Sequence, residues 1–126
     1  MSVRRFLVGL ALLVLVAFIG GLTLLNNYLL DGIHGWFAST VLDFGKDEDT
    51  EYAPGYSDQA FRTIKVGMTT QEVLAILGPP LEAASLGGTR ETWRWSRSPG
   101  DKSYRVRAIV FEAGKVMKIK REFYVD

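Results

Sequence analysis

The side chains that could support catalysis or metal binding are few and scattered in this sequence. The chain has one histidine, His34, and no cysteine, so it lacks thiolate nucleophiles, thiolate metal ligands and disulfides. His34 lies far in sequence from the C-terminal half, where a catalytic serine would need it as a base. Glu91 and Glu112 are carboxylates of the kind that act as acid and base, but neither their spacing nor their context indicates such a pair. We therefore expect a protein that is not an enzyme and that uses no cofactor or metal.

Basic side chains form the clearest pattern of potential binding groups. They alternate with apolar ones along three segments that we predict to be strands, residues 89–97, 103–112 and 115–125. If these strands are neighbours in one sheet, their polar faces carry a basic stripe made of Arg90, Arg94, Arg105, Arg107, Lys118 and Lys120. We expect this stripe to bind an acidic protein surface or anionic lipid headgroups; the alternative is a solvated face that keeps the sheet soluble.

Two large apolar residues, Ile109 and Phe111, fall on the same polar face by alternation. If both are exposed, they are candidates for a partner-binding contact; the alternative is a bulge that turns them inward. The opposite face carries Trp93 and Trp95, which we expect in the core, together with the apolar residues Tyr104, Val106, Ala108 and Val110.

The elements that position these strands are two short helices. Thr69 and Glu72 have the capping-box spacing, and Gly78 followed by two prolines ends that helix. A shorter helix over residues 59–64 begins at Ser57 or Asp58, and residues 81–86 give a weaker signal for a fourth, edge strand. The sequence therefore predicts an α+β fold, with two short helices packed on a three- to four-stranded antiparallel sheet.

An uncharged apolar stretch from Phe6 to Leu25 follows directly after Arg4 and Arg5. As a helix, this stretch would cover about 30 Å, the thickness of a bilayer's hydrocarbon core. The two arginines favour a cytoplasmic N-terminus. The residues that we expect to anchor the helix in lipid are Phe6, Leu10, Leu13, Phe18, Leu22 and Leu25. A cleaved signal peptide, with its apolar core over residues 7–16, is the alternative.

Charge is distributed unevenly over the three parts into which we divide the chain: an anchor (residues 1–30), a juxtamembrane segment with an acidic linker (31–56) and a folded module (57–126). Residues 31–52 hold six acids and one lysine, whereas residues 53–126 hold twelve Lys or Arg and eight acids. We expect a helix along or just outside the membrane over residues 26–44, with Tyr28 and Trp36 at the interface, and then a solvated acidic spacer. The basic excess is too small for a nucleic-acid binder.

The module also resembles a known family. The run from Phe61 to Pro80 resembles the signature of the BamE/SmpA/OmlA family of small outer-membrane assembly lipoproteins through its Gly67-Met68-Thr69 turn, its Glu72-Val73 helix and its Leu77-Gly78-Pro79-Pro80 stop. The likeness continues, over residues 57–125 as a whole, through Trp93-Arg94-Trp95, Val110-Phe111-Glu112 and Gly114-Lys115-Val116. The resemblance implies the fold of the β-lactamase-inhibitor protein and a non-catalytic role in a periplasmic machine that inserts β-barrel proteins. The lipidated cysteine of that family is missing, and a membrane-spanning segment stands in its place.

We therefore expect a single-pass protein of the bacterial inner membrane, with a cytoplasmic N-terminus and a periplasmic module. Its expected role is binding or scaffolding in outer-membrane protein assembly, or as an accessory subunit of another membrane complex. The alternative is a secreted or tethered inhibitor-like domain that binds a soluble protein through its sheet. In a third interpretation, the membrane helix is itself the main contact with the partner.

Overall fold

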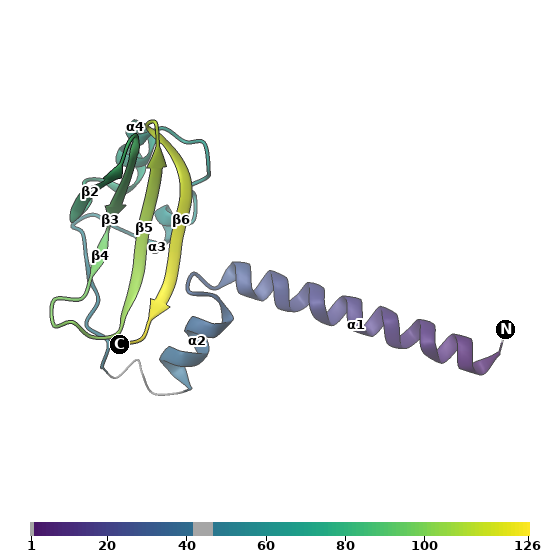
Figure 1. Cartoon of the computed structure of the whole chain (residues 1–126). Helices are drawn as coiled ribbons and strands as arrows, with labels where there is room; N and C mark the ends of the chain where they lie inside the picture. Colours follow the sequence, from purple (N-terminus) through teal and green to yellow (C-terminus); the bar gives the residue numbers. More distant parts are fainter. Residues whose placement is uncertain (1, 42–46) are drawn as a thin grey trace.

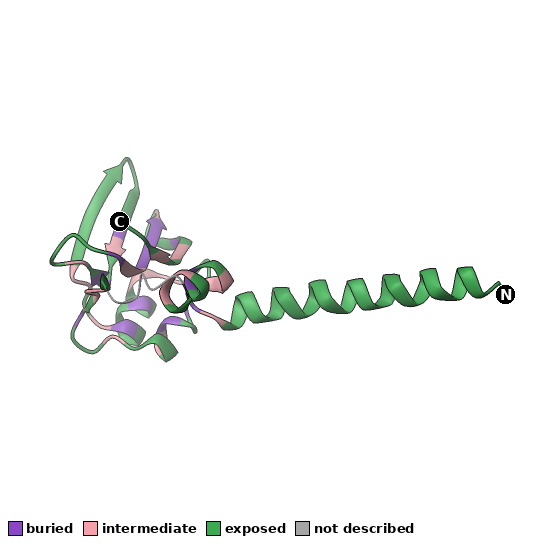
Figure 2. Cartoon of the chain, turned by 90° about the horizontal axis from the view of Figure 1, so that it is seen from below, coloured by how far each residue is buried: buried purple, intermediate pink, exposed green. Residues whose placement is uncertain are grey.

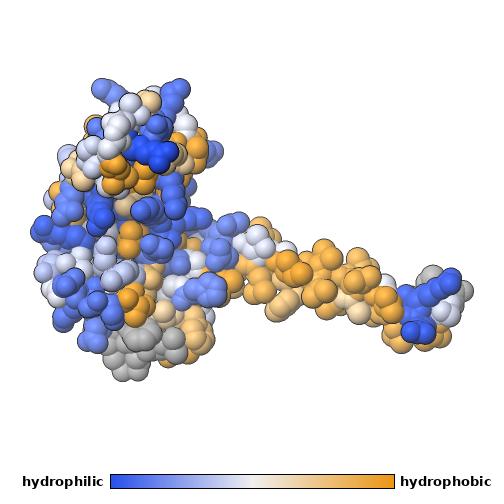
Figure 3. Space-filling model, viewed as in Figure 1, coloured by the Kyte–Doolittle hydropathy of each residue, from blue (hydrophilic) through white to orange (hydrophobic). Residues whose placement is uncertain are grey.

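The computed structural model describes residues 2–41 and 47–126. Its first element, α1 (Val3–Tyr28), is a single long helix that projects from the rest of the protein (Figure 1). No residue of α1 is buried (Figure 2), and the face of α1 seen in Figure 3 is apolar over most of its length. α1 is thus long and apolar enough to span a membrane.

The remainder of the chain forms two antiparallel sheets. The larger has the strand order β2-β3-β5-β6 and consists of β2 (Glu82–Gly87), β3 (Arg90–Arg94), β5 (Tyr104–Glu112) and β6 (Lys115–Tyr124). The smaller pairs β1 (Glu51–Tyr52) with β4 (Ser96–Arg97). Because β4 continues β3 after Trp95, β2 and β1 pair with successive parts of one extended segment. The α+β fold class is confirmed, and so is the edge strand near residues 81–86, whereas β1 was not expected.

Two short helices lie behind the larger sheet in the view of Figure 1. α3 (Asp58–Phe61) begins at Ser57, whose hydroxyl accepts a hydrogen bond from the Ala60 N–H at 3.1 Å. α4 (Thr70–Leu77) begins with the predicted capping box, in which Thr69 accepts from the Glu72 N–H at 3.2 Å and Glu72 accepts from the Thr69 N–H at 3.1 Å. Each bond satisfies a backbone donor that the first helical turn leaves free.

The hydrophobic core lies between these helices and one face of the sheet. Trp95 is fully buried there, and its indole N–H donates to the Gly78 carbonyl at 3.1 Å, which ties the sheet to the end of α4. The buried residues of this core come from both helices, from the strands and from the connections next to them, including the turn after α1: Leu30, Ala53, Phe61, Ile64, Val73, Leu77, Trp95, Ile109, Phe111 and Val116. We call the sheet face that contacts them the covered face and its opposite the open face.

A sharp break separates α1 from the next helix, α2 (Gly32–Thr40). Gly32 has a φ of +70°, and the Asn26 side chain accepts a hydrogen bond from the Ile33 N–H at 3.0 Å. Gly35 is buried where α2 meets β6. The approach is close enough that a Cβ at this position would lie 3.1 Å from that of Phe123, so a glycine fits best there. The helix expected over residues 26–44 is therefore two helices, with residues 42–44 outside the described part.

Candidate functional site: a buried arginine network and an open basic face

The six basic residues that we expected in one stripe lie on both faces of the sheet. In the strand register, Ile109 pairs with Trp93 and with Ile119, which places all three on the covered face. Arg105 and Arg107 precede Ile109 on the same strand by even steps, so they share that face. The other four, Arg90, Arg94, Lys118 and Lys120, belong to the open face. The prediction of a single stripe is therefore wrong.

Ile109 and Phe111 are also not surface residues. Both have 0% of their surface exposed, and they pack against Trp95 and the module helices. Ala108 and Val110, on the opposite face, are also buried, with 2% and 4% of their surface exposed. Ile109 and Phe111 are the larger pair, and placing them in the core between the sheet and the helices removes more apolar surface from water, which favours this facing of the strand. Arg105 and Arg107 must then lie on the covered face as well, because side chains an even number of residues apart on a strand point to the same face. Neither residue is available for the partner contact that we expected.

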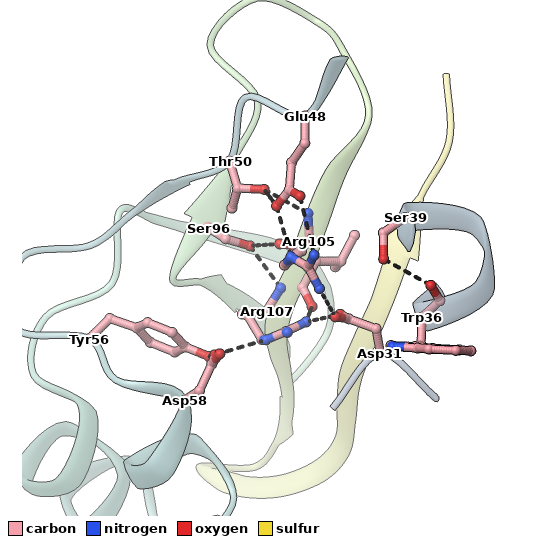
Figure 4. A network of polar contacts seen from close by, with 11 residues as sticks. Asp31, Trp36, Ser39, Glu48, Thr50, Tyr56, Asp58, Ser96, Arg105 and Arg107 are labelled. Carbon is pink, nitrogen blue, oxygen red and sulfur yellow. Dashed lines mark hydrogen bonds and ion pairs between the residues drawn. The ribbon is translucent and has the colours of Figure 1, made fainter. Parts of the chain in front are cut away.

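Arg107 lies almost completely inside the protein, with 1% of its surface exposed. Its guanidinium donates to Asp31 Oδ1 at 2.7 Å, to the Val106 carbonyl at 2.9 Å and to Asp58 Oδ1 at 3.4 Å (Figure 4). Its backbone N–H donates to Ser96 Oγ at 2.8 Å. A buried cation is tolerated only with such partners, because water no longer solvates it.

Arg105 extends this network toward solvent. It contacts Asp31 Oδ2, so that one carboxylate bridges two arginines, and it donates to Glu48 Oε1 at 2.8 Å. The hydroxyl of Thr50 donates to the same Glu48 oxygen at 2.8 Å and accepts from the Arg105 N–H at 2.9 Å. The guanidinium also lies 5.5 Å from the ring centroid of Phe123.

The pKa shifts follow from these contacts. Burial alone lowers the pKa of the Arg107 guanidinium, but the hydrogen bond and charge of Asp31 outweigh it and raise the pKa above its usual value. Burial, and then the hydrogen bond to Asp58, raises the pKa of the Tyr56 phenol, whose hydroxyl donates to Asp58 at 2.7 Å. Both groups therefore keep one protonation state throughout the physiological pH range, and we infer a structural role for the network.

The network connects the module to the end of α1. Asp31 stands three residues beyond α1, and the intervening Leu30 is buried in the core with 6% of its surface exposed. Arg62, next to α3, donates to the carbonyl of Tyr28, and its guanidinium lies 5.4 Å from the centroid of the Tyr28 ring. The last turn of α1 is thus fixed to the module by apolar, ionic and hydrogen-bonded contacts together.

The described part of the acidic linker is not a solvated spacer. Glu48 binds Arg105, and Glu51 forms an ion pair with Arg97 at 2.6 Å. Asp49 accepts hydrogen bonds from the Ser98 hydroxyl and, at 2.7 Å, from the Gly100 N–H. The acids that precede the module therefore pair with its basic residues. The uneven charge distribution along the sequence was the available signal for this pairing.

The open face keeps Arg90, Arg94 and Lys118 exposed and Lys120 partly exposed. Arg90 forms an ion pair with Glu112 at 2.7 Å, but Arg94, Lys118 and Lys120 have no ion-pair partner among the residues that the structure describes. The register aligns Arg94, Ala108 and Lys120 in one row across three strands, and Thr92, Val110 and Lys118 in the next. We call Arg94, Lys118 and Lys120 the open-face cations; small residues separate them across the middle strand.

The polar groups considered for catalysis are not assembled. Glu91 pairs with Phe111 and Glu112 with Arg90, so the two glutamates point to opposite faces of the sheet. Glu91 accepts from the Trp93 indole N–H at 3.1 Å, and His34 is exposed on α2. Within residues 2–41 and 47–126, no three His, Asp or Glu side chains are grouped as a metal site would require.

The six predicted anchor residues lie on the surface of α1. Their exposed fractions range from 40% for Leu22 to 69% for Leu13, and the others are Phe6, Leu10, Phe18 and Leu25. No other described element covers them, as expected of side chains that lipid would surround.

No protein-family model matches this chain, and no curated protein matches its sequence. Its function is therefore argued from the geometry of the anchor, the junction and the open face.

Proposed function

We propose that this protein is a non-catalytic scaffold that crosses the membrane once through α1 and docks a partner protein on its module. The observation that carries the proposal is the junction: Leu30 lies in the module core, and Asp31 binds both the buried Arg107 and the partly buried Arg105. A flexible tether would leave the module free to turn. This junction instead holds it in one orientation next to the bilayer, as a subunit of a membrane complex requires.

The proposed topology follows from charge. Arg4 and Arg5 favour a cytoplasmic N-terminus, and residues 31–52 after α1 hold a single lysine and can be translocated, so the location that we propose for the module is the periplasm. With the resemblance of residues 57–125 to the BamE/SmpA/OmlA family, this topology favours a role in cell-envelope assembly, or as an accessory subunit of an inner-membrane complex. The protein would act by binding alone.

The proposed docking surface is the open face, where Arg94 and Lys118 are exposed and Lys120 is partly exposed. None of these open-face cations has an ion-pair partner within the described part. Arg105 and Arg107 are neutralised inside the molecule, so they no longer belong to this surface. The partner chemistry that fits is an acidic protein surface, since complementary charge speeds encounter and selects the partner.

Extraction of the full-length protein from its native membrane in mild detergent, followed by intact mass measurement, tests the anchor. The expected result is an uncleaved N-terminus in the membrane fraction. A soluble chain that begins near Gly21 would contradict the anchor and favour the secreted inhibitor-like domain.

Charge reversal of the open face tests the docking surface. The variant with Arg94→Glu, Lys118→Glu and Lys120→Glu should lose the proteins that co-purify with the wild type. The control variant Lys102→Glu changes an exposed lysine in the loop before β5 and should keep them. If the triple variant also retains its partners, the sheet is not the contact, and α1 becomes the better candidate.

A further inference from the structure

We propose that Arg62 and Arg121 bind the phosphate groups of membrane lipids at the base of α1. This site rests on the proposed membrane-spanning role of α1 and involves none of the open-face cations. It is carried by three observations: the depth at which the two arginines lie, the contacts that hold Arg62 there, and a polar hollow beside Arg121.

The length of α1 determines the depth. Its apolar stretch ends at Leu25, and Tyr28 lies three residues further along the same helix, about 4.5 Å beyond that end. The hydrocarbon core of a bilayer is about 30 Å thick and the whole bilayer about 40–45 Å, so each of the two headgroup layers is about 5–7.5 Å thick. If the apolar stretch fills the hydrocarbon core, the Tyr28 carbonyl lies within the headgroup layer.

Arg62 is fixed at that depth by direct contact. One of its terminal nitrogens donates to the Tyr28 carbonyl, and the guanidinium lies over the Tyr28 ring. The side chain is otherwise exposed, and a guanidinium has five N–H donors, so donors remain for a ligand. A tyrosine ring is itself favoured at this interface.

Arg121 reaches the same level from β6. It lines a hollow of about 200 Å³ together with Asn26 and Leu29 near the end of α1, and with Gly32 and His34 of α2. The acid among the described lining residues is Asp31, and both of its oxygens already bind Arg105 and Arg107. The Arg121 side chain is exposed and forms no hydrogen bond or ion pair with any described residue.

The chemistry of the pair identifies the ligand as a phosphate group. A guanidinium binds phosphate oxygens with two parallel hydrogen bonds, which a lysine ammonium does not reproduce. At headgroup depth the available phosphates are those of the lipids. Trp36 and Phe37, about half exposed on the adjacent α2, add apolar surface suited to the same interface. The two contacts would hold the module upright against the bilayer.

The test measures lipid retention by the full-length protein. Wild type, Arg62→Gln, Arg121→Gln and the double variant are purified in mild detergent, and phosphatidylglycerol and phosphatidylcholine are titrated back while bound lipid is counted by native mass spectrometry. Each substitution should weaken lipid binding about fivefold, and the double variant about 30-fold. Arg97→Gln, which removes an exposed guanidinium from β4, is the matched control and should bind like the wild type.

Arg121→Gln decides the outcome, because the Arg121 side chain makes no hydrogen bond or ion pair within the described part that its loss could break. Both lipids carry a phosphate, so the loss should appear with both. Unchanged lipid binding in Arg121→Gln would overturn the proposal, because Arg121 would then not contact the lipid. A loss confined to phosphatidylglycerol would also overturn it, because it would indicate long-range attraction to the net charge of the lipid and not recognition of its phosphate group. If α1 is not a membrane anchor, the wild-type protein itself will be soluble and shortened. A failure of the proposed anchor can thus be distinguished from a failure of the proposed lipid site.

Discussion

The two faces of the sheet both carry basic residues, but they place them in opposite environments. On the covered face, Arg107 is withdrawn from water and Arg105 partly so, and both bind carboxylates from other parts of the chain. On the open face, Arg94 and Lys118 are exposed and Lys120 partly so, and none of these open-face cations has an ion-pair partner within the described part. The same residue types thus hold the fold together on one face and stay available for binding on the other.

The difference shows why a basic pattern in a sequence does not by itself define a binding surface. A cation removed from water loses its solvation and must recover it from nearby carboxylates and carbonyls. Once Asp31 and Glu48 supply those contacts, the charge is neutralised inside the molecule. A cation that is still solvated can replace its bound water with contacts to a partner, whereas a cation already bound to carboxylates of its own chain cannot.

The largest effect should come from Asp31→Ala, which removes the carboxylate shared by Arg105 and Arg107. Because Arg107 would remain buried without its main counter-charge, the free energy of unfolding should fall by about 3–5 kcal/mol. Urea unfolding of the full-length protein in detergent, followed by tryptophan fluorescence, measures the loss.

Combining Asp31→Leu with Arg107→Met should recover part of that stability, since an apolar pair needs no counter-charge. A loss below about 1 kcal/mol in Asp31→Ala would mean that the network does not hold the junction.

Ile109→Ala should have the next largest effect. Ile109 is fully buried on the covered face, so the substitution leaves a cavity and should cost about 2–5 kcal/mol. The same unfolding measurement applies, with Met117→Ala on the exposed part of β6 as the control. If Ile109→Ala lowers the free energy of unfolding only slightly, Ile109 is not a core residue, and the partner contact expected from the alternating pattern is again possible.

Neutralising the open face should barely affect stability. Lys118→Gln and Lys120→Gln should each change the free energy of unfolding by less than about 0.5 kcal/mol, because neither lysine has an ion-pair partner within the described part. If either variant unfolds much more easily, the open face contributes to the fold and the contrast between the two faces fails.

The smallest effect concerns Asp49 and acid. Its hydrogen bond from Ser98 is the largest of the effects that hold the pKa of Asp49 below its ordinary value of 3.8. A carboxyl whose pKa is lower in the folded state stabilises the fold above its unfolded pKa, and this contribution disappears as the pH falls through the folded pKa. Asp49→Asn should therefore flatten the loss of stability below about pH 4, measured as urea midpoints at several pH values. An unchanged acid profile would contradict this role.

Much of the fold was predictable because its determinants are local. The capping box of α4 involves residues three apart, and Gly78 ends the helix with a φ of +74°. The apolar stretch of α1 and the alternation in β5 and β6 are equally local patterns. The short strand β1 was missed, since two residues carry no periodicity and their pairing with β4 spans more than forty positions.

The facing of β5 could not be predicted from alternation, because residues 108–111 are apolar on both faces. The arginines at 105 and 107 then suggested a solvated face, and the burial of Ile109 and Phe111 reversed it. For the same reason the candidate site was predicted only in part: Arg94 and Lys118 are exposed as expected and Lys120 partly so, whereas Arg107 is buried and Arg105 is bound to carboxylates.

The sequence by itself determined the apolar helix, the two capped helices of the module, the alternating strands and the surplus of acids before the module. The tertiary structure decided which side of each strand faces the core and which acid meets which base. Asp31 and Arg107 are 76 residues apart, and only packing against the shared core brings them together. Local patterns are short-range and can be read along the chain, but the pairing of distant charges depends on which surfaces lose their water when the chain folds.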